Sequence, residues 1–253
     1  MNHNRENMER LAEFALGAGE MLLVSGAEMA RVEDTVYRIL RAGGWDSPEV
    51  FALPTGIFIA ARDIKSVSAM HRVTEHRTDL RRFILINQLS REFCGGKKSL
   101  KEAEEELSRI REVRDYGFAV CLLGYALVCG FFAVMFGGGC PEAIAAGLVG
   151  LLLCAVLQAL PKYAISDFIR MLLGGLTVGL SALLLQRFLW QPLHADPVVM
   201  GSIMPLVPGA TLTTAIRDTI NGDYAAGTAR FAEAVVMAMA IATGVAMSML
   251  LSL

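Results

Sequence analysis

Charged residues are scarce in the second half of this 253-residue chain. Residues 116–253 hold only 11 of the 48 Asp, Glu, Lys and Arg residues, and the other 37 lie in residues 1–115. The mean hydropathy of +0.48 is too high for an ordinary soluble domain. We therefore expect two domains that meet near Asp115, a polar one over 1–115 and a membrane domain over 116–253.

Other absences exclude further classes of protein. No basic run is present and the net charge is -2, which argues against nucleic acid as a partner. The first ten residues are polar and contain no apolar core of a signal peptide, so we expect no cleaved leader. The five cysteines and four histidines are scattered without the spacing of metal ligands. We expect no metal, no cofactor and no enzymatic activity.

The polar half alternates helical and strand patterns, which predicts an α+β domain. Two amphipathic helices should lie between residues 9 and 44, and the second should end at Gly43-Gly44. Ser25-Gly26-Ala27-Glu28 matches the capping box S-x-x-E, so we expect it to start that second helix.

Two strands should follow, "EVFALPTGIFIAAR" and "KSVSAMHRV", joined by a turn near Asp63. Pro54 interrupts the first and suggests a sheet edge or a bulge. A helix closed by Gly95-Gly96 comes next, with Asn87 predicted on a buried face beside Leu80 and Ile84. Ser99 should then cap an amphipathic helix.

Five apolar stretches in the second half are long enough, or nearly so, to cross the hydrocarbon core of a bilayer, which takes a helix of about 20 residues. They cover residues 116–136, 143–160, 168–188, 197–216 and 231–252. Lys and Arg flank the second and fourth connecting loops, which places those loops and the polar half in the cytoplasm and the C-terminus outside. Small residues recur along the spans and should allow close helix contact: Gly147, Gly150, Gly175, Gly179, Ala238, Ala242 and Ala246.

Helix breakers interrupt the fourth of these stretches near its middle. Pro205 and Pro208 each cost a helix roughly 3 kcal/mol, and in lipid the freed carbonyl groups need partners. Transporters use such broken helices to aim the start of a half-helix at an anionic substrate. We expect a substrate site here, although a simple kink would show the same pattern; the candidate residues are Pro205, Pro208, Gly209, Thr211, Thr213, Thr214 and Arg217.

Few charges follow the break. Asp218 should lie at the cytoplasmic end of the fourth span, Asp223 in the "NGDY" turn, and Glu233 at the start of the fifth span, where Arg230 could pair with it. Carboxylates in such places are candidates for proton coupling, with Asp218 the first choice. Interfacial anchors and a surface ion pair are the equally simple alternative.

Several of these motifs resemble the threonine/serine exporter family. They are "SGAEMARVEDTV", "ALPTGIFIA", "NQLSR" and "LVPGATLTTAIRDTINGDYAAGTARFAEA", which follow one another in the family's order over nearly the whole chain. The family has a single-chain form and a split form, and this chain resembles the longer subunit of the split form. The resemblance implies proton-driven export of small amino acids or small dicarboxylates such as succinate from the inner membrane. It also implies a short integral-membrane partner, a homo-oligomer, or both.

The resemblance carries over particular residues without settling their roles. In the polar half they are Ser25, Gly26, Glu28, Arg31, Glu33, Thr55, Asn87 and Arg91. In the membrane half they are Pro205, Pro208, Gly209, Arg217, Asp218, Gly222, Asp223 and Glu233.

Two other functions remain open at this point. A membrane-anchored hydrolase could use Ser25, His71 and Asp79 as a triad, although no G-x-S-x-G motif surrounds the serine. A membrane-tethered regulator could sense a metabolite through the polar half, but five spans with a broken helix exceed what an anchor needs.

Overall fold

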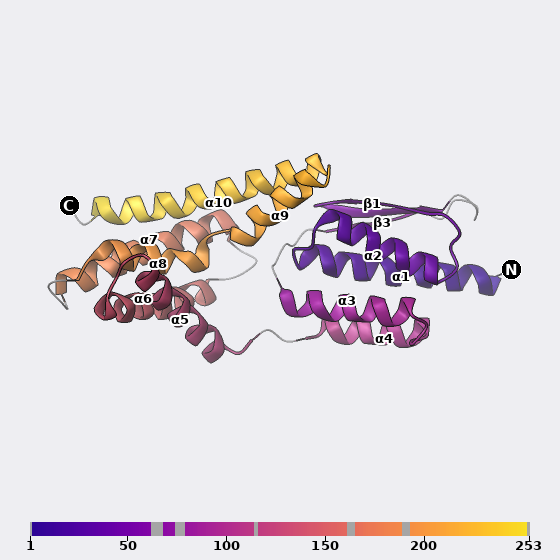
Figure 1. Cartoon of the computed structure of the whole chain (residues 1–253), viewed down its shortest axis with the longest axis horizontal. Coiled ribbons are helices and arrows are strands. Elements are labelled where there is room, and N and C mark those ends of the chain that lie inside the picture. Colours follow the sequence, from indigo (N-terminus) through magenta and orange to yellow (C-terminus); the bar gives the residue numbers. More distant parts are fainter. Residues whose placement is uncertain are drawn as a thin grey trace. The chain divides into compact units, whose positions relative to one another are not determined.

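A computed structural model describes residues 2–61, 68–73, 79–113, 116–160, 165–188 and 193–251 (Figure 1). The chain is mostly helical and contains one small sheet. In order, the elements are α1 (Asn2–Val24), α2 (Met29–Ala42), β1 (Pro48–Leu53), β2 (Gly56–Ala61), β3 (Ser68–Arg72), α3 (Leu80–Cys94), α4 (Leu100–Arg111), α5 (Phe118–Met135), α6 (Cys140–Ala159), α7 (Asp167–Phe188), α8 (Ala195–Ile203), the 3-10 helix η1 (Met204–Leu206), α9 (Gly209–Ile220) and α10 (Tyr224–Leu251).

The chain forms two compact units. The first, here called the polar unit, comprises residues 1–114 together with residues 210–232. The second, the apolar unit, comprises residues 115–209 and 233–253. Most of α9 and the start of α10 therefore belong with the N-terminal residues in the polar unit.

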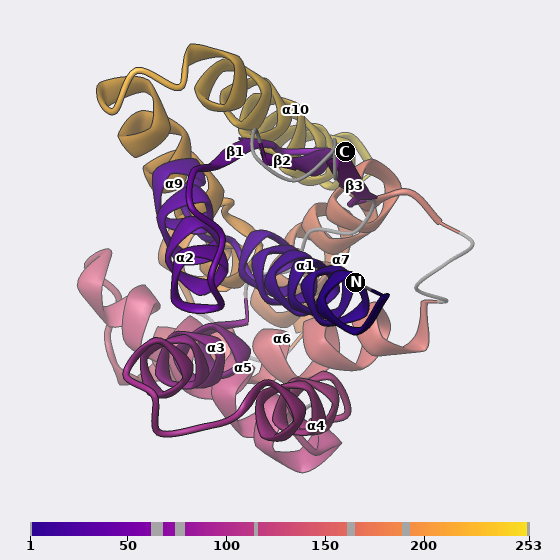
Figure 2. The same ribbon diagram turned by 90° about the vertical axis from the view of Figure 1, so that its right-hand side faces the viewer.

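The polar unit is layered. Its three strands form an antiparallel sheet in the order β1-β2-β3. Helices α1 and α2 lie against one face of that sheet, and α3 and α4 lie on the far side of these two helices (Figure 2). Alternation along β2 explains the arrangement, because Ile57 and Ile59 are buried against the helices while Phe58 between them is exposed.

The first predicted strand is a hairpin, which corrects our prediction. β1 and β2 pair in register from Pro48–Ala61 to Leu53–Gly56, and Pro54 and Thr55 make the turn between them. A proline has no amide proton to donate to a ladder, so the turn suits it better than the strand does. The second predicted strand is β3, and the turn expected near Asp63 lies outside the described residues.

The predicted capping box at Ser25 and Glu28 is wrong. Gly26 takes the left-handed conformation (φ 87°), and its amide donates to Leu23 O while that of Ala27 donates to Leu22 O. This is a Schellman ending of α1, and it leaves Ser25 as the residue directly after that helix. Helix α2 begins at Met29, with Glu28 as N-cap residue and no capping hydrogen bond from the Glu28 side chain.

The other predicted helix ends in the polar unit are confirmed. Helices α2 and α3 are followed by Gly43 and Gly95, and Ser99 forms a capping box with Glu102 at the start of α4. The predicted buried face of α3 is wrong: Leu80 and Ile84 are exposed, whereas Ile86, Leu89, Ser90 and Phe93 are buried.

Among the described residues, four helices are long and apolar enough to cross a membrane: α5, α6, α7 and α10. The predicted break in the fourth stretch is confirmed as a feature of the backbone. The segment from α8 through η1 meets α9 at an angle of 57°, and the pair counts as a fifth span if it crosses as one unit. Helix α10 begins at Tyr224, seven residues before the predicted fifth span.

Glycine brings the helices of the apolar unit together. A Cβ atom built on Gly175 of α7 would lie 2.4 Å from the carbonyl oxygen of Ile241 on α10, and one on Gly244 would lie 2.2 Å from that of Leu172. The expected close contact at Gly175 and Gly179 is therefore confirmed. The corresponding prediction for Ala238, Ala242 and Ala246 is wrong, because these three are exposed and Ile241, Gly244 and Ser248 occupy the contact face of α10.

Candidate functional site

The candidate site is built on a helical hairpin that packs inside the polar unit. Helix α9 ends at a turn in which Gly222 is left-handed (φ 94°) and the amide of Asp223 donates to the carbonyl of Asp218. Helix α10 then returns alongside α9, and a Cβ atom on Gly227 would lie 2.2 Å from Thr219 Oγ1. Ala226 is buried in the hydrophobic core of the polar unit. The hairpin is therefore part of that core.

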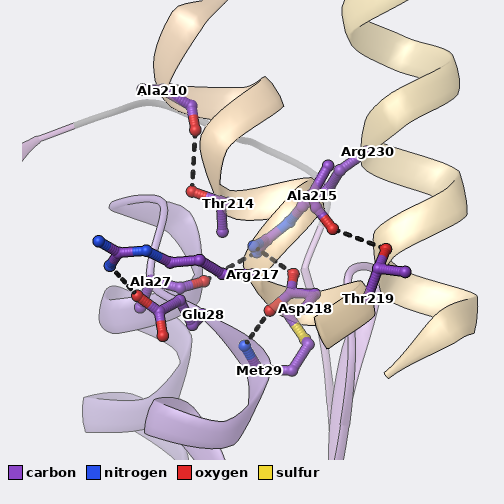
Figure 3. Close-up of polar contacts among 10 residues, drawn as sticks. All are labelled: Ala27, Glu28, Met29, Ala210, Thr214, Ala215, Arg217, Asp218, Thr219 and Arg230. Carbon is purple, nitrogen blue, oxygen red and sulfur yellow. Dashed lines mark hydrogen bonds and ion pairs between the residues drawn. The ribbon is translucent and has the colours of Figure 1, made fainter. Parts of the chain in front are cut away.

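Asp218 is the centre of this site and is fully buried (Figure 3). Its Oδ1 accepts a hydrogen bond of 3.0 Å from the backbone amide of Met29, and its Oδ2 accepts one of 2.8 Å from the Arg230 guanidinium. The same guanidinium donates to the carbonyl of Ala27 at 2.9 Å. The segment at residues 27–29 and the α9–α10 hairpin, whose contacting residues are at least 189 positions apart in sequence, therefore meet at one carboxylate.

The Met29 amide explains why an acidic residue fits here. Met29 is the first residue of α2, and the first amides of a helix have no partner within the helix. Because the Glu28 side chain makes no capping bond, the Asp218 carboxylate takes the place of a side-chain cap from a position 189 residues away. The helix dipole also favours a negative charge at this end.

A second ion pair lies beside the first but is open to solvent. The Arg217 guanidinium donates to Glu28 Oε1 at 2.6 Å, and the Arg217 side chain is 61% exposed. The Arg230 and Asp218 side chains are only 9% and 0% exposed. We call these residues (Glu28, Met29, Arg217, Asp218 and Arg230) together with Ala27 the hairpin site.

Burial shifts the ionisation of one carboxyl group near this site. It raises the pKa of Glu33, although the amide of Ala52, which donates to Glu33 Oε1 at 2.8 Å, opposes the rise. The negative charge of Asp223 adds to the shift at Glu33.

The remaining residues of the N-terminal motifs lie elsewhere in the polar unit. Arg31 stands over the Phe83 ring, 5.3 Å from its centroid, and lines a groove of about 470 Å³ with Asn87 and Arg91. Asn87 is half-buried and donates to the carbonyl of Phe83. The carbonyl oxygen of Thr55, a residue of the turn between β1 and β2, accepts a hydrogen bond from the amide of Val73.

The predicted substrate residues fall on both sides of the boundary between the two units. Pro205, Pro208 and Gly209 belong to the apolar unit, whereas Thr211, Thr213, Thr214 and Arg217 belong to the polar unit. The hydroxyl of Thr214 donates to Ala210 O within α9. Arg217 takes part in the hairpin site. Of the coupling candidates, Asp218 and Asp223 belong to the polar unit and Glu233 to the apolar unit, where it is half-buried.

Ser25, His71 and Asp79 do not form a catalytic triad. The Ser25 hydroxyl has no hydrogen-bond partner among the residues that the structure describes, and His71 Nε2 lies 3.1 Å from Glu20 Oε1. Asp79 caps α3 by accepting the amide of Arg82. Among the described residues, no group of three His, Cys, Asp or Glu side chains is placed to hold a metal ion.

The pairing of Arg230 with Asp218 is a contact of this site that the sequence did not point to. Glu233, three positions along the same helix, was the only partner that helical spacing offered Arg230. The available signal was the Asn-Gly turn at 221–222, which folds α9 and α10 into a hairpin and brings residues 218 and 230 together.

Comparison with known proteins gives the family. The model of the threonine/serine exporter family, ThrE, matches residues 13–252. A threonine/serine exporter of Corynebacterium glutamicum is 26% identical over 94% of this chain, which spans about half of that protein's length. Proteins described as the probable succinate transporter subunit YjjP are similar over almost their whole length: that of Klebsiella aerogenes is 24% identical over 98% of this chain, and that of Escherichia coli K12 is 26% identical over 96%.

No solved structure matches the chain. The family match covers nearly all of the sequence, including the strands, the broken helix and the hairpin site. With four or five candidate spans among its described residues, the chain is a multi-pass membrane protein, and it belongs to the threonine/serine exporter family.

Proposed function

We propose that this chain is one subunit of a proton-coupled secondary exporter of small amino acids such as threonine and serine, or of small dicarboxylates such as succinate. The family match over residues 13–252 is the observation that carries the proposal. The relatives' names supply the two substrate classes. Both carry a carboxylate, a group that the positive end of a helix dipole favours.

The broken helix is the proposed substrate site. η1 ends at Leu206 and α9 begins at Gly209, and the prolines on either side of Val207 prevent a continuous helix. The amides at the start of α9 and the hydroxyls of Thr211 and Thr213 would bind the carboxylate. Such interruptions are tolerated in lipid where the backbone lines a cavity, which supports a transport role over a simple kink.

The hairpin site is the proposed coupling element. α9 leads directly from the break, so a carboxylate at its far end can link protonation to the geometry of the break. Protonation of Asp218 removes its charge attraction for Arg230 and weakens its cap on α2. The hairpin would then detach from the N-terminal helices. Glu233 at the start of the apolar part of α10 is the competing candidate for the coupling group.

A second membrane subunit would complete the transporter. The relatives named as subunits, which this chain matches over almost their whole length, support this. We propose a short integral-membrane partner, a homo-oligomer, or both. The polar unit would face the cytoplasm, with the N-terminus inside and the C-terminus outside. A periplasm-active reporter should then work after Leu253 and fail after Gly222, and the opposite pattern would overturn this topology.

Transport in proteoliposomes tests the function. The chain and its short membrane partner are reconstituted together, and export of threonine, serine and succinate is followed with and without an imposed pH gradient. We expect gradient-dependent export of at least one substrate, and Asp218→Asn should retain export while losing its dependence on the gradient. If Asp218→Asn keeps that dependence and Glu233→Gln loses it, the coupling role passes to Glu233. Absence of export of all three substrates by the complex, and by the chain alone, would contradict the proposed function.

A further inference from the structure

A second cavity of the polar unit, separate from the hairpin site, combines a buried serine hydroxyl with an excess of arginine. It has a volume of about 350 Å³ and lies where the end of α1, the end of β3, the start of α3 and the end of α4 meet. Its polar lining consists of Glu20, Ser25, Arg72, Arg82 and Arg111. All of these residues belong to the polar unit.

Two donors at this cavity are buried without a hydrogen bond. Within the part of the chain that the structure describes, the hydroxyl of Ser25 has no hydrogen-bond partner, and the Ser25 residue is only 3% exposed. Within the described residues, Nε of Arg82 makes no hydrogen bond either, but it forms an ion pair with Asp79 Oδ2 at 3.4 Å, and another nitrogen of the same guanidinium donates to the carbonyl of Val113. Buried polar groups of native proteins are almost always paired, so the unpaired Ser25 hydroxyl beside this cavity indicates an acceptor that binds there.

The charges at the cavity also favour an anion. Glu20 is shared between His71 and Arg111, and Asp79 pairs with Arg82. Within the described part of the chain, the side chain of Arg72 has no hydrogen-bond or ion-pair partner, so one guanidinium is left over. A planar guanidinium binds a carboxylate through two parallel hydrogen bonds, which makes arginine the usual residue for this purpose.

We propose that this cavity binds a small organic carboxylate, with Arg72 and Arg82 holding the carboxylate group and the Ser25 hydroxyl donating to it. The volume admits a molecule of few heavy atoms. The site is distinct from the broken helix, so the chain would bind this ligand in addition to the substrate that it exports.

The place of Ser25 connects this ligand to the hairpin site. Ser25 is followed at once by Gly26 and by Ala27, whose carbonyl accepts from Arg230. Its own carbonyl accepts the amide of Asp79 at 3.4 Å, next to the start of α3. A ligand bound to the Ser25 hydroxyl would therefore hold the segment on which the α9–α10 hairpin is docked, and its binding should protect that segment.

Calorimetry and amide hydrogen exchange on the full chain in detergent test this proposal. Succinate, threonine and inorganic phosphate are titrated separately into the wild-type chain and into Arg72→Gln, Ser25→Ala and Arg38→Gln. Arg38 is an exposed arginine of α2 paired with Asp34, and it does not line the cavity, so Arg38→Gln is the matched control. Exchange identifies which segment a bound ligand protects.

We expect at least one of the two carboxylates to bind and to protect residues 20–27 and 79–84. Arg72→Gln should weaken this binding about tenfold, Ser25→Ala should weaken it by less, and Arg38→Gln should leave it unchanged. Carboxylate binding that protects only the region of the broken helix, or that is unchanged in Arg72→Gln, would overturn the proposal. Binding of phosphate alone would overturn the assignment to carboxylates. Export by Arg72→Gln is measured in the proteoliposomes described above. This measurement separates a failure of the cavity proposal from a failure of the proposed export function.

Discussion

The two units of this protein bring helices together by opposite means. In the apolar unit, backbone approaches backbone at several glycines, as between Gly175 and the carbonyl of Ile241. In the polar unit, a large hydrophobic core does most of the packing, and a buried ion pair between Asp218 and Arg230 fixes one hairpin to it. In lipid, burial of apolar surface gives no driving force, so close contact must replace it.

This difference shows where the chain can be expected to move. Backbone contacts through glycine have no charge that a proton can change. The hairpin site, in contrast, depends on the charge of the Asp218 carboxylate and on its hydrogen bond to the start of α2. A change of protonation would therefore act on the polar unit and leave the helix contacts of the apolar unit intact, which is the property that a coupling element needs.

The largest effect should come from breaking the buried pair. Arg230→Met leaves the Asp218 carboxylate buried without its partner, which costs about 3–5 kcal/mol. The double substitution of Asp218→Leu with Arg230→Met removes both charges and should recover a large part of that loss. Amide exchange of the α9–α10 hairpin, read as a local free energy of opening, measures both. Equal protection in the wild type and in Arg230→Met would show that the pair does not hold the hairpin.

A smaller effect should follow from adding one methyl group to a glycine contact of the apolar unit. Gly175→Ala places a Cβ against a carbonyl that cannot move independently, and overpacking of this kind costs about 1–3 kcal/mol. The control is Gly124→Ala on α5, where a Cβ meets nothing within 4 Å and the loss of a helical glycine should stabilise by about 0.5–1 kcal/mol. Thermal unfolding in detergent compares the two. If both variants melt alike, glycine is not what allows the contact between α7 and α10.

The exposed ion pair of the hairpin site should contribute little. Arg217→Gln removes the partner of Glu28, and an ion pair with one side chain 61% exposed is worth about 0.2–1 kcal/mol. The same exchange measurement should show a loss that is several times smaller than that of Arg230→Met. A loss as large as that of Arg230→Met would mean that burial does not separate the two pairs.

The smallest effect concerns pH and Glu33. Because the folded-state pKa of Glu33 is raised above its ordinary value of 4.5, the folded unit holds a proton that the unfolded chain has already released. Stability is therefore lost as pH rises from that ordinary value through the folded pKa. Glu33→Gln removes this cost and keeps an oxygen for the Ala52 amide. Its advantage over the wild type should grow with pH over this interval and then stay constant, as thermal unfolding would show; a constant difference throughout would contradict the raised pKa.

Local signals in the sequence predicted the parts of the structure that depend on local chemistry. Pro205, Pro208 and Gly209 predicted the break because a proline in the interior of a helix removes a hydrogen bond and clashes with the preceding turn, and Ser99 predicted a cap because serine is a preferred N-cap residue. Ser25 shows the limit of such signals. Its motif fits a capping box, but Gly26 favours the left-handed conformation more strongly, and α1 ends there.

The hairpin site could be predicted only in part, because its contacts join residues far apart in the chain. Sequence motifs singled out Glu28, Arg217 and Asp218, yet no spacing rule connects Asp218 to an amide 189 positions away. Periodicity likewise could not show that α10 extends beyond its apolar stretch into the polar unit. The partner of Asp218, Arg230, becomes evident only when the turn at Gly222 is seen to fold α9 onto α10.

A reversible crosslink tests the central claim, that the hairpin must leave the N-terminal helices during export. The five native cysteines are replaced, and Glu28→Cys and Arg217→Cys are introduced together, since these two side chains lie in contact at the surface of the site. A cleavable thiol crosslinker is applied to the complex in proteoliposomes, and export is measured before crosslinking, after it, and after cleavage. We predict export before, none while the hairpin is tethered, and recovery on cleavage. Export at an unchanged rate through the tethered protein would contradict the account.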